Sequence, residues 1–337
     1  MRKFLLAVAL LGILGLAFGG YWFWYAELLR TGLRDWRTAR MAEGYRIEHS
    51  EPVVNGFPAT LVARLQAPHI ASPRGWRWHG DEALLEAAVF APGQLSLTLR
   101  GRQELTMSVG GGGQRVDRFA SNDASLTIDL APDGAPLAGR GRIAGYRLAE
   151  GPHKLLSGAS MTIDFHQLPT AGDGRSSSDF NASLRQVDLS RLIGEPLGGL
   201  LHALDLRGRL VAWPRAGETK GEPTPWNGYE GRIDIEHLDL RWPPVDLSAS
   251  GAIGLDEQRR PAGRLDAWWR DLPALIDRLV AAGLVESQAA VPIKAAFMLL
   301  PRRKAADGRV ERLLPIVLED GRVFVGPIEV GRVTSLP

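Results

Sequence analysis

The sequence contains no cysteine in its 337 residues. That absence excludes a disulfide scaffold, a cysteine nucleophile, a thiolate metal site and an iron–sulfur protein. An excess of one charge is also missing, since 40 Lys and Arg balance 38 Asp and Glu for a formal net charge of +2. We therefore expect no nucleic-acid partner. The charged fraction of 23% is that of an ordinary soluble domain, which excludes a disordered chain and a polytopic membrane protein.

Catalytic motifs are scarce as well. The seven histidines are scattered, and no two have the spacing that places two metal ligands on one helical face. The run Gly139–Gly145 imitates a dinucleotide-binding loop but misses its spacing, and Gly110–Gly113 lacks the Lys-Ser or Lys-Thr that completes a phosphate cradle. We expect no catalytic residue, no metal ion and no cofactor, and we interpret the chain as non-enzymatic.

One long apolar stretch is present at the N-terminus. Phe4 to Ala26 carries no charge, and at about 1.5 Å per residue it is long enough to cross a hydrocarbon core of about 30 Å. It ends in aromatic residues suited to a membrane–water interface, namely Tyr21, Trp22, Trp24 and Tyr25. We predict that residues 1–26 are an uncleaved membrane anchor, and a long signal peptide is the alternative.

The start of the chain also predicts a location. Arg2 and Lys3 followed by an apolar region are typical of an export signal, so we expect a single-pass protein of the bacterial inner membrane with most of its chain in the periplasm. The charge count alone does not fix this orientation, because further arginines follow the stretch. Residues 27–43 read as a helical continuation, either a stalk or a helix lying on the membrane surface.

From Gly44 to the C-terminus, apolar residues alternate with polar ones, for example over Leu95–Leu99, Leu126–Leu130 and Met161–Phe165. This period of two is typical of antiparallel strands with one wetted face. We predict a mainly β domain over residues 44–337, built as a long curved antiparallel meander that forms a half-barrel or gutter. The Gly- and Pro-rich stretch 214–225 is interpreted as a long hairpin loop or a boundary between two halves of the sheet.

Only a few short amphipathic helices are expected. Asp271 fits an N-cap and Pro273 a first turn, and a second helix is expected to begin near Pro292. A third is expected to begin at Ser190 and to run through Leu200 and Leu201. Each is expected to cover part of the apolar face of the sheet. The basic run Arg302–Lys304 is interpreted as a solvated loop, because binding of lipid headgroups usually takes about four to eight such charges.

Short segments along the chain carry a resemblance to a known family. They are Asn55–Pro58, Trp76–Trp78, Leu247–Asp256, Asp320–Val323 and Gly326–Ile328. With the N-terminal anchor, they resemble the bacterial family known as domain of unknown function 2125 over nearly all of the chain. This resemblance implies no activity and no catalytic residue. The anchor and long meander are more distantly similar to AsmA-like envelope proteins, which are linked to lipid transfer or outer-membrane homeostasis.

The leading functional hypothesis rests on the sheet itself. A few short helices are too few to cover a long meander, and an uncovered apolar concavity suits acyl chains. We expect that surface to be lined by Leu95, Leu97, Leu126, Ile128, Met161 and Ile163. The predicted protein is a membrane-anchored envelope protein that binds or transfers lipid, with the bilayer and a lipid as partners. The alternative is a scaffold or assembly factor whose edge strands pair with another envelope protein.

Overall fold

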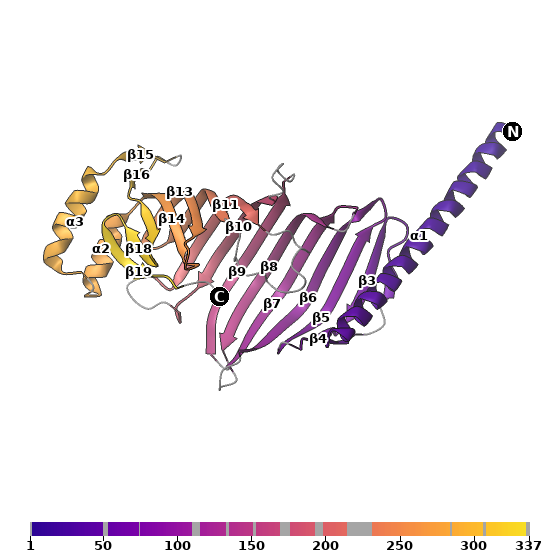
Figure 1. Cartoon of the computed structure of the whole chain (residues 1–337). Helices are drawn as coiled ribbons and strands as arrows, with labels where there is room; N and C mark the ends of the chain where they lie inside the picture. The colour runs from indigo at the N-terminus through magenta and orange to yellow at the C-terminus, as the bar shows by residue number, and fades with distance from the viewer. Residues whose placement is uncertain are drawn as a thin grey trace. The chain divides into compact units, whose positions relative to one another are not determined.

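A computed structural model of the chain describes residues 2–49, 53–73, 75–109, 115–132, 135–150, 153–168, 176–192, 198–213, 231–283, 285–305 and 308–334. The predicted fold class is confirmed: the described chain is mainly β, an antiparallel meander in an open sheet, with a helix at its N-terminus (Figure 1). It divides into two compact units. The N-terminal unit holds Met1–Gly134 with Leu148–His153, and the C-terminal unit holds Ala135–Arg147 with Lys154–Pro337. The predicted boundary at 214–225 lies outside the described residues.

The N-terminal unit is a set of antiparallel strands centred on β5, which pairs with β3, β4 and β6, while β7 pairs with β6. Its elements are α1 (Arg2–Ala42), β1 (Arg46–Glu48), β2 (Val53–Asn55), β3 (Thr60–Gln66), β4 (His69–Ala71), β5 (Trp76–Ala88), β6 (Ala91–Val109) and β7 (Arg115–Leu130). Gly101 lies in the middle of β6. It has φ +74° at a bulge within β6, where the pairing with β7 shifts between Arg100 and Gln103.

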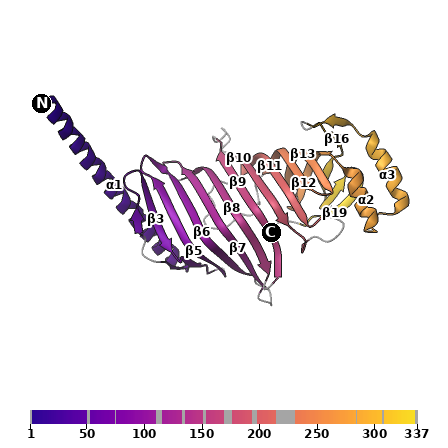
Figure 2. The ribbon, with the colours of Figure 1, turned by 180° about the vertical axis from the view of Figure 1, so that it is seen from behind.

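Helix α1 covers the beginning of this sheet (Figure 2). The residues Trp22, Ala26, Leu29 and Leu33 recur at helical spacing and pack on the buried side chains of β2, β3 and β5, among them Leu61. The ring nitrogen of Trp22 donates a hydrogen bond to the carbonyl of Thr60 at 3.1 Å. The segment predicted as a stalk is therefore part of a helix whose first described side chains already contact the domain.

The predicted membrane span falls only partly on described side chains. Those of residues 2–18 lie outside the described part of the chain. Within the described part, no helix is long and apolar enough to cross a membrane.

The C-terminal unit continues the same antiparallel pattern from β9 to β14, each strand pairing with the next. Most of β8 (Pro136–Glu150) also belongs to it. Its other elements are β9 (His153–Gln167), β10 (Ser176–Asp188), β11 (Leu200–Trp213), β12 (Arg232–Trp242), β13 (Val245–Leu255), β14 (Pro261–Trp269), α2 (Leu272–Ala281), α3 (Ser287–Leu299), β15 (Arg302–Lys304), β16 (Val310–Leu313), β17 (Ile316–Glu319), β18 (Arg322–Val325) and β19 (Ile328–Arg332).

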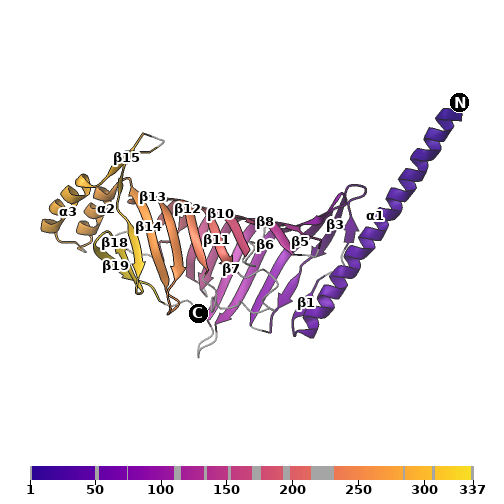
Figure 3. The same ribbon diagram turned by 45° about the horizontal axis from the view of Figure 1, so that its top comes forward.

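One hydrophobic core cluster of described residues joins β12, β13, β14, α2 and α3. Figure 3 shows the ribbon of these elements at the C-terminal part of the chain. Leu247 and Ala249 of β13 and Ala267 and Trp269 of β14 share one face of the sheet, and α2 and α3 lay Ile276 and Phe297 in the same cluster. The Trp269 ring nitrogen donates to the Leu314 carbonyl at 2.9 Å, which ties the short C-terminal strands to β14. The helices therefore cover the apolar face of β13 and β14, as expected for short amphipathic helices on a sheet.

The helix predictions were right for one element and inaccurate for two. Helix α2 begins as predicted, with the Asp271 carboxylate accepting from the Ala274 backbone at 3.3 Å and a proline in its first turn. Helix α3 begins earlier than predicted, at Ser287, and Pro292 lies inside it. The third helix was predicted wrongly at its end, because Leu200 and Leu201 begin β11. The alternating residues that follow pair with β10 and β12, so sheet pairing overrides the local helical pattern.

Candidate functional site

The six residues predicted to line an apolar surface fall in two places. In the N-terminal unit, Leu95 lies directly across from Ile128 and Leu97 across from Leu126, so that β6 and β7 bring four of them together on one face. In the C-terminal unit, Met161 and Ile163 of β9 share one face. Each set therefore forms an apolar face within its own unit.

The apolar face of the C-terminal unit extends beyond the two predicted residues. Met161 pairs with Leu184, Ile163 with Ala182, and Phe165 with Phe180 on β10. The next strand continues the row, since Leu184 pairs with Leu204 and Ala182 with Leu206. The residues of β9 and β10 on this face are called the open apolar face, which comprises Met161, Ile163, Phe165, Phe180, Ala182 and Leu184.

This face is called open because its side chains are less buried than those on the apolar face of β13 in the same unit. Leu247 on β13 keeps only 3% of its surface exposed because α2, α3 and neighbouring strands cover it, whereas Ile163 on β9 keeps 50%. In the described part of the chain, no helix belongs to a core cluster with the open apolar face. The open apolar face is thus less buried than the apolar face of β13, since Ile163 is half-exposed and its other members are only partly buried.

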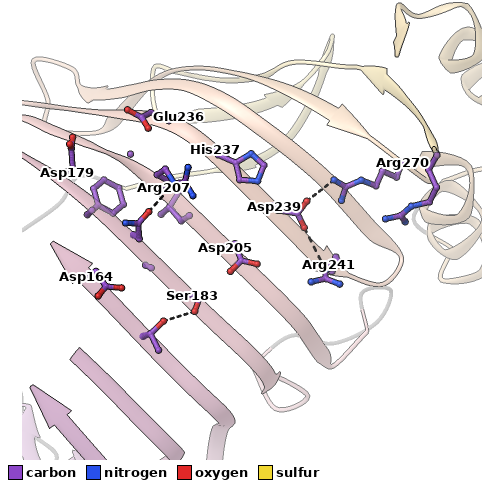
Figure 4. A pocket seen from close by; sticks show the side chains of 17 residues that line it. Asp164, Asp179, Ser183, Asp205, Arg207, Glu236, His237, Asp239, Arg241 and Arg270 are labelled. Carbon is purple, nitrogen blue, oxygen red and sulfur yellow. Dashed lines mark hydrogen bonds and ion pairs between the residues drawn. The ribbon is translucent and has the colours of Figure 1, made fainter. Parts of the chain in front are cut away.

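A polar cavity of about 870 Å³ lies against these strands, and its lining includes Phe180 and Ala182 of the open apolar face as well as charged and polar residues (Figure 4). Alternation along each strand places carboxylates and arginines here, because residues next to those of the open apolar face point the other way. The charged and polar lining side chains come from β9 to β12 and from two arginines after β14. They include Thr162, Asp164, Asp179, Asn181, Ser183, Asp205, Arg207, Glu236, His237, Asp239, Arg241, Arg270 and Arg309.

A β-bulge places two of these side chains next to each other. Ile235 of β12 pairs with Gly251 and Leu238 with Ala249, so Glu236 and His237 lie where the pairing shifts. Both side chains are exposed and line the polar cavity, and Arg207 of β11 lies directly across from His237. Bulges of this kind often redirect side chains next to functional sites.

Most of the carboxylates in the cavity are already paired with arginines. Asp205 forms an ion pair with Arg185 at 2.6 Å, Asp179 with Arg209 at 2.7 Å, and Asp164 with Arg140 at 2.7 Å. The hydrogen bond and charge of Asp179 raise the pKa of Arg209 above its ordinary value. Each side chain in these pairs is more than one-third exposed, so each pair contributes little to stability.

One end of the cavity is closed by a network around Arg270. Its guanidinium contacts Asp239 at 2.7 Å, Asp246 at 2.5 Å and Glu311 at 2.8 Å. Burial alone would lower the pKa of Arg270, but the hydrogen bonds that it donates to Asp239 and Asp246 raise it well above the ordinary value. Glu311 is 1% exposed and also forms an ion pair with Arg303 at 2.8 Å. Asp239, Arg270, Arg303 and Glu311 of this network also border a second cavity of about 450 Å³.

The described polar side chains that line the cavity act as hydrogen-bond donors and acceptors. Ser183 shares a hydrogen bond with Thr162 at 2.6 Å, and the described residues around His237 provide no hydroxyl or carboxylate hydrogen-bonded to it. The described lining residues therefore form no nucleophile–base pair of the kind that nucleophilic catalysis uses. In the described part of the chain, no group of three or more His, Asp and Glu residues has a geometry that suits a metal ion.

The aromatic residues predicted to lie at the membrane interface differ in their burial on α1. Trp22 departs from the expectation, since it is 5% exposed and packs inside the N-terminal unit, on the side of the helix that faces the sheet. Tyr25 packs partly against the same cluster. Tyr21 and Trp24 are exposed, and their place at a membrane interface stays a prediction.

The fold and its two faces define a mainly β protein with an open sheet and an apolar face that its own helices cover only in part. The chain belongs to the family described as "Uncharacterized protein conserved in bacteria (DUF2125)", which matches residues 22–334. The resemblance inferred from its short segments is thereby confirmed. Comparison with curated proteins and with solved structures gives no match.

Proposed function

We propose that this protein is a non-enzymatic lipid-binding protein of the bacterial envelope, and that the open apolar face holds acyl chains. The observation that supports this most is the half-exposed state of Ile163 within a row that includes Met161, Phe165 and Phe180. An apolar face in water gains stability when it is covered, at about 0.8 kcal/mol for each methylene group buried. A lipid tail provides a long, flexible strip of such groups.

The polar face of the same strands favours a ligand on one side only. Its carboxylates and arginines are exposed and paired, so an acyl chain placed there would remove charged groups from water without compensation. The two sides of β9 and β10 thus differ enough to predict where a lipid binds. Transfer of the lipid along the sheet is the further step of this proposal.

The proposed location is the periplasmic side of the inner membrane, with the beginning of the chain as its anchor. Because Trp22 and Ala26 pack on the sheet, the inserted segment in this proposal ends before Trp22 and runs from Phe4 to Tyr21. A reporter enzyme that is active only in the periplasm, fused after Pro337, is expected to be active. Activity of a cytoplasmic reporter at the same position would contradict the location.

Site-specific photo-crosslinking tests the lipid proposal directly. A photoreactive amino acid replaces Ile163 on the open apolar face, and the matched control replaces Thr162, which precedes it and lines the polar cavity. The full chain is irradiated in membranes, purified gently and analysed by mass spectrometry. We expect lipid adducts at position 163 and few at position 162.

Two other outcomes would contradict the proposal. Equal lipid labelling at both positions would show only that the chain lies in a membrane. A protein adduct at position 163 in place of lipid would instead favour the scaffold, in which this face is covered by another envelope protein.

A further inference from the structure

Helix α3 carries an exposed surface without a polar side chain. Its inner side places Ala290 and Phe297 in the core of the C-terminal unit. From Val291 onward its outer side presents only apolar, exposed residues, which are called the α3 face: Val291, Pro292, Ala295, Ala296, Met298 and Leu299. Leu299 is 88% exposed and Val291 72%. A surface helix normally carries charged residues on this side, and a helix that is apolar all round is normally covered.

The one charge in the helix does not interrupt this surface. Lys294 forms an ion pair with Asp277 of α2, so its ammonium group is directed toward the neighbouring helix. Figures 1 and 3 show α3 on the outer side of α2, with no described strand beyond it. The α3 face is therefore apolar from Val291 to Leu299 and carries no negative charge, whereas the exposed Gln288 precedes it in the first turn of the helix.

Basic residues follow the α3 face directly. Arg302 and Lys304 lie on β15, two residues apart and hence on the same side of the strand, and both are exposed. Neither makes an ion pair with a described residue. Arg303 points to the other side, where it contacts Glu311 and lies over the Trp268 ring at 4.2 Å. An apolar strip bordered by two free cations is complementary to a surface that is apolar inside and anionic at its edge.

From this arrangement we infer that the α3 face, with Arg302 and Lys304, is a second membrane-contact surface, which inserts shallowly into a bilayer containing anionic lipid. The inference replaces the interpretation of Arg302–Lys304 as a merely solvated loop, because the neighbouring apolar helix supplies the binding area that three charges alone lack. It concerns the C-terminal unit only and does not rest on the proposed lipid site on β9 and β10.

The lack of native cysteine makes a local test simple. An environment-sensitive fluorophore is attached to Leu299→Cys in the full chain, and the control carries it at Glu236→Cys in the polar cavity. Both are added to vesicles of phosphatidylcholine with phosphatidylglycerol, and to vesicles of phosphatidylcholine alone, each containing a lipid-chain quencher. We expect quenching at position 299 in the anionic vesicles, weaker quenching in the neutral ones, and none at position 236.

Substitutions separate the two parts of the surface. Arg302→Gln and Lys304→Gln are each expected to lower the ratio of inserted to free label about fivefold in anionic vesicles and to leave it unchanged in neutral ones. Val291→Ser is expected to lower it in both, whereas Val330→Ser, on a similarly exposed apolar residue of β19, is the matched control and leaves it unchanged.

Absence of quenching at position 299 in anionic vesicles would overturn the inference. So would a disulfide that joins two copies of the unlabelled Leu299→Cys chain when the labelled chain shows no quenching, because a second copy of the chain would then cover the α3 face. Crosslinking of lipid at position 163 is independent of both results, so failure of this inference and failure of the proposed function can be told apart.

Discussion

Two regions of the C-terminal unit share one strand pattern and differ in what covers them. On β13 and β14 the apolar face is sealed by α2 and α3, and the polar side is bordered by the network around Arg270 and Glu311. On β9 and β10 the apolar face is only partly buried, with Ile163 half-exposed, and the polar side borders a cavity. Alternating sequence therefore makes a strand without deciding whether that strand is core or surface.

Within this unit, we therefore expect the covered strands to contribute mainly to stability and the open strands mainly to binding. The free energy of folding is concentrated where side chains are removed from water, which is the region from β12 to α3. The open strands contribute hydrogen bonds and cross-strand contacts but leave apolar area for a ligand. Substitutions that act on stability in the first region are expected to act mainly on binding in the second.

The largest effect is expected from Arg270→Ala. Removing the guanidinium leaves the buried Glu311 with Arg303 alone and separates Asp239 and Asp246 from their shared partner. Breaking a buried ion pair on one side typically costs about 3–5 kcal/mol. Thermal or denaturant unfolding of the detergent-solubilised chain, followed by tryptophan fluorescence, measures the loss.

The matched control is Arg264→Ala on β14, whose pair with Asp266 at 3.1 Å is exposed. Its expected cost is below about 1 kcal/mol. If the two variants lost equal stability, the ion pairs of Arg270 would contribute no more than a surface pair. The proposed difference between the polar sides of the sealed and open regions would then be wrong.

The second prediction compares the apolar faces of the sealed and open regions. Leu247→Ala in the sealed region is expected to cost about 2–5 kcal/mol, because it creates a cavity in a packed core. Ile163→Ala in the open region is expected to cost about 1 kcal/mol, because solvent already reaches half of that side chain. The same unfolding measurement on both variants gives the ratio. Similar losses would mean that the open apolar face is covered by other parts of the chain.

The fold was largely predictable from local patterns. Leu126, Ile128, Met161 and Ile163 lie on strands because their period of two matches the pleat. Helix α2 was predictable from Asp271, since a cap followed by a proline is a local signal. Helix α3 was placed less accurately, because Pro292 was taken as a first-turn residue although it lies inside the helix.

The two faces of the site were less predictable. The same alternation appears at Leu247 and at Ile163, and only long-range packing makes one buried and the other exposed. The polar cavity was missed, although one signal was present: the alternation from Ile233 to Ile235 resumes out of phase at Leu238, which indicates the bulge at Glu236 and His237. The pairing of Arg270 with Glu311 joins residues far apart in sequence, so no local pattern predicts it.

The smallest effect is expected at the end of the open strands. There the Asp188 carboxylate accepts from Lys154 at 2.6 Å and from the Ser190 hydroxyl at 2.6 Å, which joins β9 to the end of β10. The hydrogen bonds from Lys154 and then Ser190 lower the pKa of Asp188 well below its ordinary value. A carboxylate with a lowered folded-state pKa stabilises the protein above its unfolded pKa of about 3.9, and this contribution is lost as pH falls toward the folded value.

Asp188→Asn is therefore expected to be less stable than the unaltered chain at neutral pH, by less than about 1 kcal/mol because the pair is exposed and screened. The difference in unfolding free energy should stay constant from about pH 7 to pH 5 and shrink below about pH 4, where the unfolded carboxylate begins to take up a proton. High salt should reduce it at neutral pH, since exposed pairs are screened. A difference that grows on acidification would contradict the assigned direction of the pKa and show that Asp188 is not stabilised as a carboxylate. A loss as large as that of Arg270→Ala would instead place the end of β9 and β10 among the sealed parts of the unit.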